Sequence, residues 1–254
     1  MLFGKKGRKK KHNIKSSKII VGETIYSAEA EGYNRLKDNV LYLNPNDESM
    51  VIQIESSLSH EGKTTVACNL AVSLGYTDKK VILVDLDFRR PRSHRLFELS
   101  KEVGIAEYLT GEAKLEDIIK TTKYKNVSLM TRGADIHNPS LVLVSDKFKA
   151  LINELRKTYD YIILDCPPVL QTSDYIHISK VADGTLFLVA YATTTRTQVR
   201  EAIAELRKNG VKLLGSVITM YDKKKDKGSG YYSGKYYTYS YFKNEKDEEE
   251  NEAQ

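Results

Sequence analysis

A run of small, basic and hydroxyl side chains in the first third of the chain has the composition of a phosphate-binding loop. It ends in Gly62, Lys63 and Thr64, shortly after an apolar segment, although Ser57 replaces the usual first glycine. In such loops, backbone N–H groups at a helix N-terminus face the phosphates, the lysine reaches the β- and γ-phosphates, and the hydroxyl binds Mg²⁺. A chance Gly-Lys-Thr in a surface turn is the alternative. We expect nucleotide contacts from consecutive residues of this loop, which are Ser59, His60, Glu61, Gly62, Lys63, Thr64 and Thr65.

Aspartates follow two other apolar segments. Asp85 and Asp87 come after Val81–Val84, and Asp165 comes after Tyr161–Leu164. The carboxyl ends of parallel strands meet at one edge of a sheet, where ligands bind. One acid of the first pair could hold the metal while the other lies near an incoming hydroxyl. Asp165 fits the Mg²⁺-side carboxylate of a phosphate-loop enzyme.

Six tyrosines fall within eleven residues near the end of the chain. Glycines and serines interleave with them, and the stretch has no aliphatic side chains that could bury the rings. Such a composition favours a mobile, solvated segment. Exposed tyrosines in a chain with a nucleotide site suggest phosphate acceptors, and a low-complexity tail without chemistry is the alternative. The six are Tyr231, Tyr232, Tyr236, Tyr237, Tyr239 and Tyr241.

Apolar periodicity predicts the elements that would position these residues. Strands alternate with helices, which predicts an α/β fold with a doubly wound, mostly parallel sheet flanked by helices, as in phosphate-loop NTPases. We expect a basic flexible arm at 1–18, one nucleotide-binding domain at 19–221 and a flexible tyrosine-cluster tail at 222–254. The predicted helices are 27–43, 63–74, 146–157 and 197–209, and the predicted strands are 51–55, 81–84, 161–164, 185–190 and 213–219.

Composition narrows the class of protein. Of 254 residues, 41% are hydrophobic, which is enough for a core, and no apolar run approaches the roughly 18 residues that span a bilayer. Cys68 and Cys166 lie in apolar or motif segments and are interpreted as buried free thiols of a cytosolic protein. The net charge of +6 matches the six unopposed basic residues between Lys5 and Lys11. Such an arm favours an acidic membrane surface or partner over nucleic acid, with a solvated tail as the alternative.

Together these motifs resemble the bacterial tyrosine kinases of capsule and exopolysaccharide synthesis, specifically the cytoplasmic type typical of Firmicutes. The resemblance extends over most of residues 25–241. It rests on the loop at 61–64, the Asp-Leu-Asp-Phe-Arg-Arg-Pro segment at 85–91, Asn-Pro-Ser at 138–140, Asp-Cys-Pro-Pro at 165–168 and the tyrosine-rich end.

The resemblance implies that 19–221 is the kinase domain of an ATP- and Mg²⁺-dependent protein-tyrosine kinase. Lys63, Asp85 and Asp87 carry over as catalytic residues, with Asp85 favoured as the acceptor of the tyrosine proton. Thr64, Asp87 and Asp165 carry over as the metal ligands. The family implies autophosphorylation of the tyrosine cluster between subunits of a ring that is lost on phosphorylation.

The implied partners are the cytoplasmic segment of a transmembrane polysaccharide co-polymerase, which acts as activator, and a cognate tyrosine phosphatase. The kinase would be cytoplasmic, recruited to the inner face of the membrane, and would regulate polysaccharide chain length. No nucleic-acid partner is expected.

The chain departs from the family pattern in two places. The helix motif that supports ring contacts, a glutamate with arginines three and six residues on, has become Glu31, Asn34 and Lys37. Ring formation therefore stays open. The common Pro-Gly before the loop is Ser59-His60, which could alter loop stiffness without removing phosphate contacts.

Two other functions remain as alternatives. A hydrolytic ATPase that positions division machinery or partitions plasmids shares this core, but such proteins carry a lysine where this chain has Leu58. A non-catalytic ATP-binding scaffold would not need the intact acidic residues. Arg89, Arg90 and Arg92 could bind phosphate or a partner, or could simply be solvated.

Overall fold

The computed structural model describes residues 18–22 and 27–221, with the side chain of Ala28 left out. The basic arm expected at 1–18 (except Lys18), the tail at 222–254 and all six clustered tyrosines lie outside the described residues. The helices are α1 (Ala28–Tyr42), α2 (Lys63–Gly75), α3 (Ser93–Leu96), α4 (Ile105–Thr110), α5 (Leu115–Ile118), α6 (Pro139–Leu143), α7 (Asp146–Leu155), α8 (Asp174–Ile178) and α9 (Arg196–Lys208). The strands are β1 (Met50–Ser56), β2 (Val81–Asp85), β3 (Ile119–Thr121), β4 (Val127–Met130), β5 (Tyr161–Asp165), β6 (Gly184–Ala190) and β7 (Leu213–Thr219).

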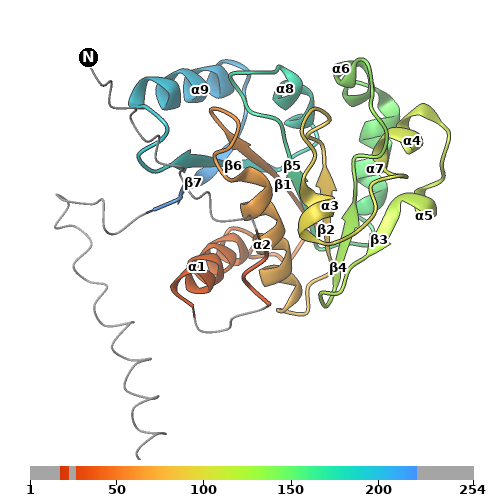
Figure 1. The fold of residues 1–254 in the computed structure, drawn as a ribbon, viewed down its shortest axis with the longest axis horizontal. Helices are drawn as coiled ribbons and strands as arrows, with labels where there is room; N and C mark the ends of the chain where they lie inside the picture. Colours follow the sequence, from red (N-terminus) through yellow and green to blue (C-terminus); the bar gives the residue numbers. More distant parts are fainter. Residues whose placement is uncertain (1–17, 23–26, 222–254) are drawn as a thin grey trace, which may run out of the picture.

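The strands form one twisted sheet with helices on both faces (Figure 1). Its order is β3-β4-β2-β5-β1-β6-β7, and every neighbouring pair is parallel except β3 with β4. The predicted doubly wound, mostly parallel α/β sheet is therefore confirmed. Because β5 is inserted between β2 and β1, the carboxyl ends of these three strands are adjacent.

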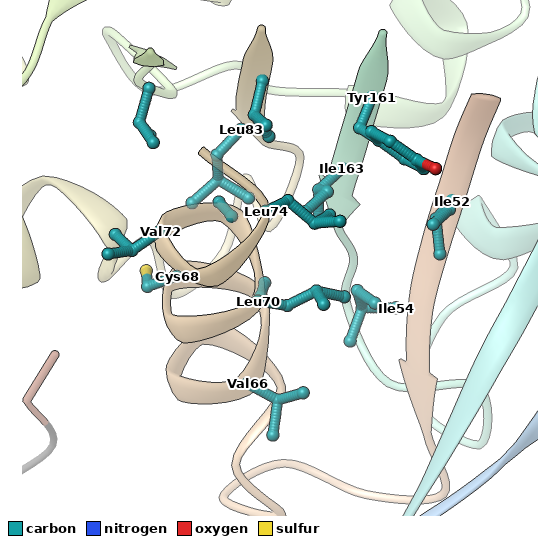
Figure 2. Packing of buried hydrophobic residues seen from close by; sticks show 14 of the residues in the cluster. Ile52, Ile54, Val66, Cys68, Leu70, Val72, Leu74, Leu83, Tyr161 and Ile163 are labelled. Atoms are coloured by element: carbon teal, nitrogen blue, oxygen red, sulfur yellow. The ribbon is translucent and has the colours of Figure 1, made fainter. Parts of the chain in front are cut away.

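The two faces of the sheet are covered by different helices, since successive strand residues point to opposite faces. On β1, Ile52 and Ile54 belong to the cluster that contains α1 and α2, whereas Val51 belongs to the cluster that contains α7. Figure 2 shows Leu70 and Leu74 of α2 lying against the strands in this first cluster. Helix α2, which begins at the phosphate loop, is thus held on the sheet by a continuous apolar surface.

The long elements are close to their predicted bounds, and the differences matter at two strand ends. Strands β2 and β5 continue through Asp85 and Asp165, so that both acids are strand residues with a set orientation. Sequence periodicity did not reveal α3, α4, α5, α6, α8, β3 or β4, because segments of three to six residues are too short to show a period.

Two expectations from composition can be compared with the structure. Cys68 and Cys166 are buried and unpaired, as predicted. Within residues 18–22 and 27–221, no helix combines the length and apolarity needed to cross a membrane.

Candidate active site

The phosphate loop joins the end of β1 to the first turn of α2. Helix α2 begins at Lys63, and Gly62 before it has φ +95°, a left-handed conformation that a side chain would strain. No side chain caps this N-terminus, so its backbone N–H groups remain free for an anion. The Lys63 side chain is only 6% exposed, and its ammonium donates to Ser56 Oγ at 3.0 Å and to the Leu58 carbonyl at 3.4 Å. The loop therefore has the backbone of a phosphate site with its lysine folded over it.

Glu61 has a bracing role that the sequence did not reveal. Its carboxylate accepts a hydrogen bond from Leu58 N at 2.9 Å and another from the Thr194 hydroxyl. Its carbonyl accepts from Thr219 Oγ1 at 2.7 Å. The Glu61 side chain thus makes one hydrogen bond within the loop and one to the segment before α9. Thr219 connects the loop to the end of β7. Any contact of Glu61 with a nucleotide would come from its backbone.

Strand register places Asp165 between the phosphate loop and Asp85. Asp165 pairs with Ile54 of β1 on one side and with Asp85 of β2 on the other. Adjacent strands lie about 4.8 Å apart, so the two carboxylates are neighbours at the sheet edge. Both are buried, with exposed fractions of 0% for Asp85 and 1% for Asp165. The predicted convergence of these acids is what the structure shows.

Asp85 is held in place by hydrogen bonds. Its Oδ2 accepts from Ser93 Oγ at 2.5 Å and from Ser93 N at 3.2 Å, and its Oδ1 accepts from Asp87 N at 3.3 Å. Burial raises the pKa of Asp85 to about 6, against the lowering effect of the Ser93 hydroxyl, and the charge of Asp87 raises it further. Ser93 was not identified from the sequence, because a serine eight residues beyond the acid carries no motif.

Asp165 differs from Asp85 in having no hydrogen-bond partner for either carboxylate oxygen within the described part of the chain. Burial, followed by the charge of Asp85, raises the pKa of Asp165 well above its ordinary value, and the nearby Thr64 hydroxyl and Lys63 ammonium oppose this. A buried carboxylate without partners is costly unless a cation or donor completes it. Such a site fits Mg²⁺.

Asp87 lies at the rim of the site. It is half-buried, and its Oδ1 accepts from Arg89 N at 3.2 Å and Arg90 N at 2.9 Å, which fixes the turn after β2. No group of three or more His, Cys, Asp or Glu side chains arranged to hold a metal occurs among residues 18–22 and 27–221. Mg²⁺ typically takes only one or two protein carboxylates and completes its shell with phosphates and water.

A half-buried ion pair links this turn to the Asn-Pro-Ser motif. Arg89 Nη1 donates to Asp174 Oδ2 at 3.0 Å, and Ser140 Oγ donates to Asp174 Oδ1 at 2.6 Å. Asp174, at the start of α8, is only 1% exposed. Sequence reasoning missed Asp174, which is 85 positions from Arg89 and stands in no recognised motif.

Glu55 is a further buried acid beneath the loop. It lies on β1, where its Oε1 accepts from Gln53 Nε2 at 2.8 Å and its Oε2 has no partner among the described residues. Burial raises the pKa of Glu55 to about 8, with the charge of Lys63 and the Gln53 hydrogen bond opposing this rise. Glu55 is therefore mostly protonated near neutral pH.

Glu55 gives the protein a pH-dependent stability. Its pKa is higher in the folded chain than in the unfolded chain, so its contribution is full below about pH 4.5 and is lost as pH rises through about 8. We expect the free energy of unfolding of wild type to fall relative to that of Glu55→Gln between about pH 5 and 8. Above about pH 8 the difference between the two should stay constant. Chemical denaturation at pH 5, 6.5, 8 and 9 measures this. A gap that does not change with pH would contradict the assignment.

The structure brings together most of the predicted site. Lys63, Thr64, Asp85, Asp87 and Asp165 meet at one edge of the sheet. The remaining predicted contacts follow the loop into α2, where they are partly or fully exposed except for Glu61; they are Ser59, His60, Glu61, Gly62 and Thr65.

Comparison with known proteins agrees with this geometry. The AAA domain family model matches residues 50–217. The tyrosine-protein kinase YwqD of Bacillus subtilis is 31% identical over 82% of this chain and 88% of its own length. The CapB protein of Staphylococcus aureus is 29% identical over 88% of this chain and 96% of its own length.

Solved structures separate the kinase from the ATPase alternative. The kinase domain of Escherichia coli tyrosine kinase ETK superposes with a TM-score of 0.79 at 26% identity, covering 87% of this chain and 86% of that one. The division protein MinD of Pyrococcus horikoshii, solved with Mg-ADP, reaches a TM-score of 0.57 at 28% identity, covering 67% and 70%. The second likeness reflects the shared nucleotide-binding core. The chain therefore belongs to the bacterial tyrosine-protein kinases of the CapB type, enzymes that phosphorylate protein tyrosines and are built on an AAA-domain core.

Proposed function

We propose that this kinase transfers the γ-phosphoryl group of Mg-ATP to the tyrosines at 231–241 of a neighbouring copy. The observation that carries the proposal is the Asp165 carboxylate, which has no hydrogen-bond partner among the described residues and lies between the strand that leads into the lysine-bearing loop and Asp85. A site that leaves a buried acid incomplete favours a ligand that brings a cation, and Mg-ATP does so.

The chain's own residues divide the binding work. The N–H groups at the start of α2 and the Lys63 ammonium hold the phosphates. Thr64, Asp87 and Asp165 would hold Mg²⁺, which when bound neutralises charge between the β- and γ-phosphates. Ser56, which now accepts the Lys63 hydrogen bond, would give up that bond as the lysine turns to phosphate.

Asp85 accepts the proton in the transfer step that we propose. The phenolic oxygen of tyrosine forms a bond to the γ-phosphorus, the bond from that phosphorus to the bridging oxygen breaks, and ADP leaves. Ser93 holds Oδ2 of Asp85 with two hydrogen bonds, whereas Oδ1 accepts only the longer one from Asp87 N. Oδ1 is therefore the oxygen with spare capacity for the tyrosine proton.

The end of the described chain lies beside the site. Thr219, the last residue of β7, donates to the Glu61 carbonyl in the phosphate loop, and Tyr221 packs on Tyr191 with ring centroids 5.0 Å apart. Ten residues separate Tyr221 from Tyr231, and such a length spans at most about 33–36 Å when extended. This reach supports transfer to the same copy or to an adjacent one, and the family resemblance favours the adjacent copy.

Incubation with Mg-ATP followed by mass spectrometry of the C-terminal peptide tests the proposal. We expect phosphate on the clustered tyrosines and almost none when all six are phenylalanine. A matched variant with the exposed Tyr42 and Tyr76 changed to phenylalanine should keep wild-type incorporation. Undiminished incorporation in the six-phenylalanine chain would refute the choice of acceptor.

A mixing experiment separates transfer within a copy from transfer between copies. Lys63→Met chains, which keep their tyrosines, are mixed with active chains that carry the six phenylalanines. Phosphate on the Lys63→Met tail can come only from the other copy. An unmodified tail in this mixture, with wild type active alone, would show transfer within one copy.

The cellular role that we propose follows the relatives. The kinase would act in the cytoplasm at the inner face of the membrane, activated by the cytoplasmic segment of a transmembrane polysaccharide co-polymerase and reversed by a tyrosine phosphatase. It would thereby regulate capsular or extracellular polysaccharide synthesis. Its self-association would be a ring, in which Asn34 and Lys37 stand where the family's helix motif has two arginines. The Oδ1 of Asn34 accepts a hydrogen bond from Ser73 Oγ of α2 at 3.3 Å.

A further inference from the structure

A strongly basic pocket lies beside the phosphoryl-transfer site. Its volume is about 320 Å³, in the range of small-molecule sites. Arg92 Nη2 is 3.2 Å from Nε2 of His60 in the phosphate loop, so the pocket is adjacent to this loop. Its charged lining consists of Arg89, Arg90, Arg92, Arg95, Lys101 and Arg132, with Asp135 as the acid.

Much of this positive charge is not neutralised. Arg89 is paired with Asp174, and the buried Arg132 is paired with Asp135. The other four basic residues form no ion pair within the described ranges 18–22 and 27–221; these residues are Arg90, Arg92, Arg95 and Lys101.

The pKa of His94 reflects the positive potential of this pocket. Its pKa is lowered first by burial and then by the charges of Arg95, Lys101 and Arg132. Its Nδ1 is buried and has no hydrogen-bond partner among the described residues. A concave surface with several cations that form no ion pairs among the described residues is complementary to a compact anion.

The lining suits a phosphate monoester on an aromatic ring. Guanidinium groups bind phosphate oxygens with two parallel hydrogen bonds, and their planes also stack on aromatic rings. A phosphotyrosine carries about −1.5 to −2 charges near neutral pH and three acceptor oxygens. Pro91, which also lines the pocket, offers an apolar contact for the ring.

This chain supplies such a group next to further acceptors. Its six clustered tyrosines are one to four positions apart in the sequence. In an extended chain, two residues span about 7 Å and four span about 13 Å. A tail could thus place one phosphotyrosine in a pocket that borders the active site while a second tyrosine reaches the phosphoryl donor.

We propose that the basic pocket binds a phosphotyrosine of the 231–241 segment of a second copy and presents the next tyrosine of that tail for transfer. The proposal rests on the proposed autophosphorylation. Its consequence is that the first phosphorylation of a tail is slow and later ones are faster.

Peptide binding tests the pocket separately from catalysis. Labelled peptides of residues 229–243, unphosphorylated or phosphorylated only at Tyr239, are titrated against phosphatase-treated full chain saturated with Mg-ADP, which fills the nucleotide site. We expect the phosphopeptide to bind about tenfold more tightly or better, as one or two charge-assisted hydrogen bonds would give. Arg95→Gln with Lys101→Gln should remove this preference.

The matched control removes the same charge elsewhere. Lys149→Gln with Lys157→Gln changes two exposed lysines, one in the first half of α7 and one just beyond its end, and should keep the preference. Equal affinity for both peptides, or equal loss in both double variants, would overturn the pocket assignment. The Arg95→Gln, Lys101→Gln variant is also tested for binding to anionic vesicles. If this variant loses vesicle binding but keeps its preference for the phosphopeptide, the pocket binds a membrane surface and the phosphotyrosine assignment is overturned.

Intact-mass spectrometry over time tests the ordering. Wild type should pass from unmodified to multiply phosphorylated chains with little singly phosphorylated intermediate, whereas the Arg95→Gln, Lys101→Gln variant should accumulate it. Accumulation of that intermediate by wild type would overturn the ordering. If no tail phosphate appears in wild type, the proposed function fails, and the peptide titration still decides whether the pocket binds phosphotyrosine.

Discussion

Lys63→Met should reduce tyrosine phosphorylation about 10²–10³-fold or more, the loss typical for removal of one preorganised charge-stabilising donor. The Lys63 ammonium is the cation at the start of α2, buried over the loop by its bonds to Ser56 and Leu58. Methionine has a similar length and no charge, so it fills the space without reaching phosphate. Initial rates of phosphate incorporation, measured with Mg-ATP and the activating segment present, provide the readout.

The fold should survive this change. Methionine buries an apolar side chain where an ammonium was buried, so thermal stability in the absence of nucleotide should not fall. Lys125→Met, at an exposed lysine paired with Asp78, serves as the control and should keep wild-type activity. Retention of more than about a tenth of the wild-type rate by folded Lys63→Met would contradict the assignment of this lysine to the transferred phosphoryl group.

Asp165→Asn should produce opposite effects on activity and on stability. Activity should fall on the order of 10²-fold, because Mg²⁺ would lose its buried carboxylate. Stability without nucleotide should rise. The pKa of Asp165 is raised in the folded chain by burial and by Asp85, so above its unfolded pKa the ionisable side chain costs stability, and that cost grows as pH rises.

Thermal unfolding with and without Mg-ADP measures both consequences. For a chain of this size, 1 kcal/mol shifts Tm by about 2–4 °C. Even a partial removal of the cost of burying the Asp165 carboxylate is therefore detectable. Mg-ADP should raise the Tm of wild type far more than that of Asp165→Asn. Asp78→Asn, at a largely exposed position paired with Lys125, is the matched control. A variant that is less stable than wild type without ligand, or that keeps its Mg-ADP shift, would refute the role of Asp165.

The local chemistry of this protein could be predicted from sequence because each part is a short pattern. A Gly-Lys-Thr after an apolar strand specifies a helix N-terminus for phosphate, and apolar runs ending in acids specify strand-end carboxylates. The long helices repeat with a clear period and the buried strands are continuous apolar runs, which is why α2, β2 and β5 were expected close to where they lie. The tyrosine cluster is likewise a matter of composition alone.

Only the tertiary structure decided how the parts combine, because the deciding contacts join residues far apart in the chain. The insertion of β5 between β1 and β2 makes Asp165 the neighbour of both the loop strand and Asp85. The pairing of Arg89 with Asp174 spans 85 positions and has no local signature. The basic pocket arises from α3 and three connecting segments, none of which shows a period. Burial by this packing, which no linear pattern encodes, also leaves Asp165 without a hydrogen-bond partner among the described residues and raises the pKa of Glu55.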